Sequence, residues 1–258
     1  MKVPIALAAA FALLVGCSSS GSGDGGDGTG SSGGGALSGS IAVDAASSLT
    51  EAFDTLKSQF EAAHPGTTIK ITYGASSDLS TQISQGAPVD VFASASTTNM
   101  DDLGDQAVHP TNFVVNTLEI AVPPGNPAGI QSVEDLAKSD VKVAVCDPAV
   151  PCGVVAAQVF DNAGITVHPK ASLADVKSTL AAVESGEVDA GIVYVTDVRA
   201  AGNQVEGVEI PSDVNATTTY PIAVLKDAPN PVLAQAWVDY VLSAAGRKVL
   251  TADGFGRP

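Results

Sequence analysis

The strongest constraint on the fold is an alternation between short apolar runs and amphipathic helical segments. Residues 40–44 are typical of a strand, and the apolar side chains that follow them recur at helical spacing. Residues 68–73 alternate like a second strand, a second helical stripe follows, and residues 89–93 form a third apolar run. This order is the pattern of a parallel sheet that helices cover on both faces. We therefore expect an α/β fold.

Two short segments look like the capping box of a helix. In this motif a Ser hydroxyl and an acidic side chain three positions later each bond to the other's backbone N–H. The first segment joins Ser48 to Glu51, and the second joins Ser172 to Asp175. We therefore predict that each Ser caps the helix that follows it.

The second half of the chain continues with further strands and helices. The expected strands are residues 118–122, 141–145, 190–195 and 220–225. The expected helices include residues 154–162 and 231–244. A Pro- and Gly-rich stretch after residue 122 marks a crossover into a second domain.

The order of these elements predicts two lobes, the first of which is built from both ends of the chain. The first lobe comprises residues 37–119 and 220–258, and the second comprises residues 120–219. Two short strands that cross between the lobes would form a hinge, so that a ligand would bind in the cleft between them.

The N-terminal segment predicts export and lipid anchoring. Residues 1–16 contain Lys2 and an apolar run that is too short to span a bilayer. The run ends in Leu-Val-Gly before Cys17, which resembles the cleavage box of bacterial lipoproteins. We expect a signal peptide over residues 1–16 and a lipid on Cys17, although an ordinary secretory signal with an incidental cysteine is the alternative. Residues 17–36 are mostly Gly and Ser, which predicts a flexible tether at the extracytoplasmic face of the cell membrane.

The apolar content and the net charge of the chain limit the kinds of molecule that it is expected to bind. Apolar residues make up 45% of the chain, which is enough for a core, and the formal net charge is −16. This charge argues against nucleic acid or an anionic membrane surface as a partner. It also repels anions at long range, so that any anion site must be built from local dipoles.

Such dipoles are expected at three turns that lead from a strand into a helix. These turns contain Ser48, Ser76 and Cys152. The first turn of a helix has unpaired N–H donors and carries the positive end of the helix dipole, and Ser hydroxyls add further donors. A Ser before a helix is more often a simple cap than a ligand contact. One such turn alone is therefore weak evidence for an anion site, and only the three turns together predict one.

Several short motifs follow one another from residue 40 toward the C-terminus. They are Asp44-Ala-Ala-Ser-Ser-Leu-Thr50, Tyr73-Gly-Ala-Ser-Ser-Asp-Leu79, Gly86-Ala-Pro-Val-Asp-Val-Phe-Ala93, Val150-Pro-Cys-Gly153, Ala174-Asp-Val176, Gly191-Ile-Val-Tyr194 and Tyr220-Pro-Ile-Ala-Val224. In sequence and in order, these motifs resemble those of the molybdate-binding proteins of ABC importers. The resemblance implies a two-lobed fold of the periplasmic-binding-protein type, with a mainly parallel sheet flanked by helices in each lobe. It also implies capture of molybdate, and of tungstate, for delivery to the importer's membrane subunits.

By motif position, the resemblance assigns five contacts to the oxyanion. Ser48, Ser76 and Tyr194 would donate through their hydroxyls, whereas Cys152 and Val176 would donate through backbone N–H groups. The family usually has Ala where this chain has Cys152. Molybdate is a full dianion at neutral pH and needs only donors, whereas protonated phosphate would also need an acceptor.

The remaining cysteines, Cys146 and Cys152, lie close together in the sequence. Outside the cytoplasm such a pair favours a disulfide, and two buried thiols are the alternative. Metal binding is disfavoured, because no His or third Cys lies nearby.

The sequence offers no set of nucleophile, base and acid, and no zinc-ligand spacing. We therefore expect a monomeric binding protein without catalytic residues or a cofactor. The alternatives are a receptor for sulfate or thiosulfate, a receptor for a metal held by tyrosines, and a ligand-sensing or adhesion lipoprotein without transport. With 4 Tyr in the chain, the tyrosine-metal alternative is disfavoured.

Overall fold

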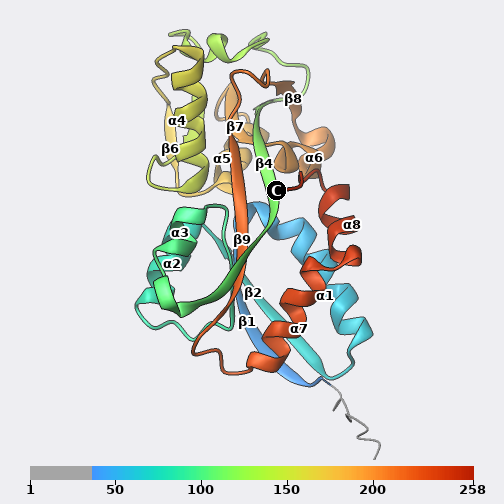
Figure 1. Ribbon diagram of the computed structural model, residues 1–258. Helices are drawn as coiled ribbons and strands as arrows, with labels where there is room; N and C mark the ends of the chain where they lie inside the picture. The colour runs from blue at the N-terminus through green and yellow to red at the C-terminus, as the bar shows by residue number, and fades with distance from the viewer. Residues whose placement is uncertain (1–36) are drawn as a thin grey trace, which may run out of the picture. The chain divides into compact units, whose positions relative to one another are not determined.

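The computed structural model describes residues 37–258, and Figure 1 shows their helices and strands. The predicted signal peptide (1–16), the predicted lipidation site Cys17 and the predicted tether (17–36) lie outside the described residues. No helix among the described residues is both long enough and apolar enough to cross a membrane.

Within residues 37–258, the strands form a nine-stranded sheet with the neighbour order β2-β1-β3-β9-β4-β7-β5-β6, and β8 pairs with β4. The strands are β1 (Gly39–Ala46), β2 (Thr67–Gly74), β3 (Val91–Ala93), β4 (Ala107–Val122), β5 (Val143–Cys146), β6 (Ala171–Leu173), β7 (Ala190–Tyr194), β8 (Glu206–Glu209) and β9 (Thr217–Leu225). Strands β2, β1 and β3 are parallel, and so are β6, β5 and β7. Antiparallel strands β9 and β4 join these two parallel groups.

Helices cover the sheet on both faces, as the alternating pattern predicts. The helices are η1 (Ser47–Leu49), α1 (Thr50–Ala63), α2 (Ser76–Ser84), α3 (Thr97–Asp101), η2 (Gly104–Gln106), η3 (Val133–Ala137), α4 (Pro151–Ala163), α5 (Val176–Glu184), α6 (Val195–Ala201), η4 (Gly202–Gln204), α7 (Pro231–Leu242) and α8 (Ala244–Ala252). Figure 1 shows α2 and α3 on one side of the β1–β2 end of the sheet, and α1, α7 and α8 on the other side.

Each parallel group of strands has its own hydrophobic core, and these cores define two lobes. In lobe 1, Phe53 and Phe60 from α1 pack edge-on against Trp237 of α7, with ring centroids 5.8 and 5.6 Å apart. The core of lobe 2 is built mainly from Val, Ala and Ile, with Val159 of α4 and Val183 of α5 fully buried. The boundaries expected near residues 119 and 220 fall inside β4 and β9 and stay predictions.

Strand β4 is longer than the predicted strand over residues 118–122. Its first part pairs with β9, and from Leu118 onward it pairs with β7. One continuous strand therefore runs through both lobes. The sequence did not reveal the first part, because residues 108–112 are exposed and include Pro110, so that no apolar alternation marks them.

The predicted capping box at Ser48 and Glu51 is wrong. Helix α1 begins at Thr50, and no side chain caps its N-terminus at Leu49. Ser48 lies in η1, where its hydroxyl bonds to that of Tyr220. A partner 172 residues away in the sequence thus takes the hydroxyl that the local pattern assigned to a cap.

The second predicted capping box is also wrong. Ser172 lies in β6, and Asp175 alone caps α5 by accepting the backbone N–H of Ser178. The helix predicted over residues 231–244 is confirmed as α7, which ends at Leu242. A further helix, α8, follows because Ser243 adopts an extended conformation and caps it.

Candidate functional site

A small cavity lies between the two lobes, and both lobes line it. Lobe 1 contributes the end of β1 with η1 and the start of α2, and lobe 2 contributes the starts of α4 and α5 and the end of β7. The lining residues are Ala46, Ser47, Ser48, Gly74, Ala75, Ser76, Ala95, Val150, Pro151, Cys152, Asp175, Val176 and Tyr194. All five predicted contact residues, Ser48, Ser76, Cys152, Val176 and Tyr194, therefore line one cavity.

The size of this cavity limits the class of solute. Its volume is about 10 Å³, whereas pockets for organic ligands usually have roughly 300–1,000 Å³. A cavity needs roughly 10–15 Å³ of such volume to hold one water molecule, so in this arrangement the two lobes leave almost no free space between them and must move slightly apart to admit even a small anion. With the lobes in this arrangement, the cavity excludes solutes of amino-acid or sugar size.

Ser48 reaches the cavity with its hydroxyl held in place. Its Oγ lies 2.8 Å from the Oη of Tyr220, and both side chains are buried. Burial raises the pKa of the Tyr220 phenol, so that this group keeps its proton at neutral pH. When Tyr220 donates to Ser48, the proton of Ser48 is left for an acceptor in the cavity.

Ser76 is oriented in a similar way from the first residue of α2. Its Oγ accepts the backbone N–H of Ala95 at 2.9 Å, and the residue is 1% exposed. The hydroxyl makes no cap bond at the helix N-terminus. Because Oγ already accepts a bond, its proton points elsewhere and can be donated to a solute.

Tyr194 contributes a third hydroxyl to the cavity lining. Its hydroxyl is buried and has no hydrogen-bond partner among the described residues. Burial raises its pKa well above the usual value, so that the phenol remains a donor. A buried unpaired hydroxyl costs free energy unless a ligand or water accepts from it.

Backbone donors complete the cavity from lobe 2. Cys152 and Val176 both lie in the first turn of a helix, where N–H groups have no partner within the helix. Within the described residues, neither N–H donates to another backbone carbonyl. The starts of α4 and α5 therefore direct free N–H groups and positive helix dipoles toward the cavity.

The loop that carries the Cys152 N–H is tightly constrained. A disulfide joins Cys146 to Cys152, with Cα atoms 5.7 Å apart. At Gly153, an added Cβ would lie 2.0 Å from the carbonyl oxygen of Asp147. Only glycine fits this position, so that covalent and steric restraints together fix the start of α4.

The cavity has no positively charged lining residue. Its one charged residue is Asp175, whose carboxylate accepts the N–H of Ser178 at 2.8 Å as the cap of α5. Within the described residues, no cluster of three or more His, Cys, Asp or Glu side chains is arranged to hold a metal ion. The polar groups described above therefore present mainly hydrogen-bond donors to the cavity.

Tyr220 is the site residue that sequence reasoning missed. The segment that begins with Tyr220 belongs to the matching motifs, but no role followed from it. Its contact with Ser48 joins β9 to η1 across most of the chain length. No local pattern could have revealed that bond, although a buried Tyr within a strand is a weak signal of a polar partner.

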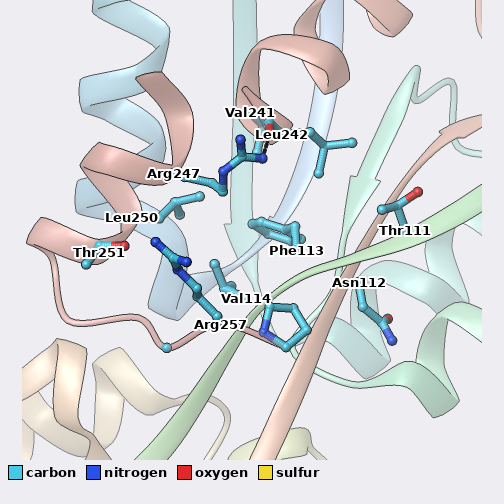
Figure 2. Close-up of a pocket in the computed structure, with 12 residues that line it drawn as sticks. Thr111, Asn112, Phe113, Val114, Val241, Leu242, Arg247, Leu250, Thr251 and Arg257 are labelled. Carbon is cyan, nitrogen blue, oxygen red and sulfur yellow. Dashed lines mark hydrogen bonds between the residues drawn. The ribbon is translucent and has the colours of Figure 1, made fainter. Parts of the chain in front are cut away.

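A second, larger cavity lies in lobe 1, away from the cleft. It has a volume of about 360 Å³, and Phe113, Val114 and Leu250 form much of its surface (Figure 2). Arg247 and Arg257 also line it, and Arg247 donates to the carbonyl of Leu242. Both arginines are exposed, and neither forms an ion pair within the described residues.

The fold and the interlobe cavity together define a two-lobed protein with the architecture of a solute-binding protein. A profile of the family described as bacterial extracellular solute-binding protein matches residues 41–256. The chain belongs to this family, which places it outside the cytoplasm as a solute receptor.

Individual proteins similar to this chain include molybdate-binding proteins. The molybdate-binding protein ModA of Mycobacterium tuberculosis strain H37Rv is 42% identical over 222 residues, which cover 85% of this chain and 85% of that protein. The solved structure of the periplasmic molybdate-binding protein of Azotobacter vinelandii matches with a TM-score of 0.75 at 20% identity, covering 84% of this chain and 99% of that chain.

A receptor for another anion has a similar fold. The sulfate-binding protein SubI of Mycobacterium tuberculosis H37Rv matches with a TM-score of 0.70 at 20% identity, covering 84% of this chain and 86% of that chain. At this level of identity the two structural matches concern the fold alone.

Proposed function

We propose that this protein captures molybdate, and also tungstate, outside the cytoplasm and delivers it to the membrane subunits of an ABC importer. One observation carries the proposal: five neutral donor groups line a single small cavity between two lobes, with no Lys or Arg among the lining residues. The 42% identity to a molybdate-binding protein supports molybdate as the solute.

The chemistry of the donors favours a fully ionised oxyanion. Three hydroxyls and two backbone N–H groups can all donate, and a dianion accepts at each of its oxygens. Protonated phosphate would need an acceptor for its own proton. The nearest carboxylate, on Asp175, is already used as a helix cap. Donors in a water-poor cleft also interact more strongly with charge than they do in water.

Calorimetric titration with molybdate, tungstate, sulfate and phosphate tests the assignment. We expect saturable binding of molybdate and tungstate and much weaker binding of the other two anions. In a thermal-shift assay, an anion at a hundred times its dissociation constant should add about 2.7 kcal/mol to the free energy of unfolding. Equal shifts with molybdate and phosphate would overturn the assignment, and tighter binding of sulfate would make the protein a sulfate receptor.

We also propose where the protein is held and in which state it acts. The receptor is anchored by a lipid on Cys17, acts as a monomer, needs no cofactor and catalyses no reaction. Metabolic labelling with a fatty acid should mark the wild-type chain, whereas Cys17→Ala should abolish the label and release the protein from the membrane. A labelled Cys17→Ala variant would disprove the anchor.

A further inference from the structure

One ammonium group joins side chains from three helices, α1, α5 and α6. The Nζ of Lys177, in the first turn of α5, lies 2.8 and 2.9 Å from the two carboxylate oxygens of Glu51. It also lies 3.1 Å from Oδ1 of Asp197 in α6. Glu51 belongs to lobe 1, whereas Lys177 and Asp197 belong to lobe 2. Of the ion pairs in residues 37–258, only the pair of Lys177 and Glu51 joins the lobes.

Each member of this triad lies close in sequence to one of the donors that line the cavity. Glu51 follows Ser48 by three residues, and Lys177 directly follows Val176. Asp197 accepts the backbone N–H of Tyr194 at 3.2 Å. The triad therefore connects the backbone segments that carry a hydroxyl of lobe 1 and two donors of lobe 2.

We propose that Lys177 is a positioning residue, whose ion pair with Glu51 latches the two lobes together over the bound anion and slows its release. This inference rests on the proposed function, because it concerns the retention of the solute in the same cleft. The pair exists only while the starts of α1 and α5 face each other. Separation of the lobes would break the contact with Glu51 and keep the contact with Asp197, which lies in the same lobe as Lys177.

Lys177 does not act as an anion contact. It is not among the residues that line the cavity. Its single positive charge also faces two carboxylates, so that the triad as a whole is negative. If the triad acted only through its charge, removal of the Glu51 carboxylate would strengthen the binding of a dianion. If the triad is a latch, the same change weakens binding, and the sign of the effect separates the two roles.

The exposed fractions of the three side chains decide which residue to substitute in a test of the ion pair. The Asp197 side chain is 0% exposed, and burial raises its pKa to about 6, against the lowering effect of Lys177. Loss of Lys177 would leave this buried carboxylate without a cation and would disturb lobe 2 itself. Glu51 is 46% exposed. Glu51→Gln therefore removes the interlobe half of the triad and leaves each lobe intact.

The test compares Glu51→Gln with wild-type protein by molybdate and tungstate titration and by stopped-flow dissociation. Glu184→Gln, at the exposed end of α5, is the matched control for loss of one negative charge. For Glu51→Gln we expect about three- to tenfold weaker binding, mainly through faster release of the anion. We expect unchanged thermal stability of the anion-free protein. Lys177→Arg, which keeps the charge, should retain most of the affinity.

Two further measurements exclude a merely structural role. Added salt should speed anion release from wild-type protein more than from Glu51→Gln, because only the wild type has the ion pair to screen. The double variant Glu51→Gln/Lys177→Gln should release the anion no faster than Lys177→Gln alone. Equal or tighter binding by Glu51→Gln would overturn the latch and leave the proposed function intact. Wild-type protein that binds neither molybdate nor tungstate would instead overturn the proposed function.

Discussion

The interlobe cleft and the apolar cavity in lobe 1 offer a solute different chemical surroundings. The cleft has a volume of about 10 Å³ and is lined by hydroxyls and helix starts without a cation. The cavity in lobe 1 has a volume of about 360 Å³, an apolar wall and two arginines. Formal charge alone would place an anion in the second cavity.

The geometry favours the cleft instead. Arg247 and Arg257 are exposed, so that water screens their charge, whereas Ser48, Ser76 and Tyr194 are buried. The hydroxyls of Ser48 and Ser76 are already oriented by bonds to the protein. An anion that enters the cleft therefore meets donors that need little reorganisation. In this acidic chain, fixed neutral dipoles in a buried site are better suited to hold a dianion than solvent-exposed charges.

Removal of both serine hydroxyls should produce the largest effect. We expect Ser48→Ala/Ser76→Ala to weaken molybdate binding by about 3–6 kcal/mol, since each bond to a charged acceptor contributes about 1.5–3 kcal/mol. Calorimetric titration measures the change. Ser77→Ala is the control, because Ser77 is the neighbour of Ser76 but does not line the cavity. Unchanged affinity in the double variant would mean that the anion binds elsewhere.

Tyr194→Phe should produce the next largest loss of affinity, about 1.5–3 kcal/mol, because one donor to the anion disappears. The anion-free variant should unfold at the same or a higher temperature than wild type, since the unpaired buried hydroxyl is removed. Titration and thermal unfolding measure the two effects. Tyr240→Phe changes a partly buried tyrosine that lies outside the cleft and bonds to Gln59, and it serves as the control. A Tyr194→Phe variant that binds molybdate normally would contradict the role of this hydroxyl.

Loss of the disulfide should have a moderate effect. Closing a loop this short restricts the unfolded chain by about 2 kcal/mol, so Cys146→Ser/Cys152→Ser should lose about that much stability. Chemical denaturation measures it. Molybdate should also bind more weakly, because the loop that presents the Cys152 N–H gains freedom. Thiol titration of the unreduced wild type should find neither cysteine free, and two free thiols would contradict the bridge.

The smallest effect is expected in the other cavity. Arg247→Gln/Arg257→Gln should change the affinity for molybdate by less than about 0.5 kcal/mol, because both charges are solvent-exposed and outside the cleft. The same titration provides the measurement. A large loss of affinity would show that positive charge, rather than the neutral donors, holds the anion.

The sequence predicted the elements that local patterns control. The alternation of apolar runs and helical stripes predicted the parallel strands and their covering helices, because burial on one face leaves a regular period. It failed where polar residues continue a strand, as in the first part of β4.

The site was predictable only in part. Family resemblance named five residues that line one cavity, and their contact with an anion stays a prediction. Local patterns assigned Ser48 to a cap, because they contain no information about Tyr220. The contact of Glu51 with Lys177 joins residues 126 positions apart and was equally invisible. Long-range polar contacts follow from the folded backbone, and no spacing rule encodes them.

Strand β4 has a consequence for how the chain can change in length. Its residues up to Thr117 pair with β9, and its residues from Leu118 onward pair with β7. An amino acid inserted between these two stretches would shift one pairing against the other by one position. Side chains that face inward in lobe 2 would then face outward, since side chains alternate along a strand. The junction at Thr117 and Leu118 therefore fixes the register of one lobe against the other, whereas the irregular pairing near Thr111 and Val114 shows that the first part of β4 already accommodates bulges.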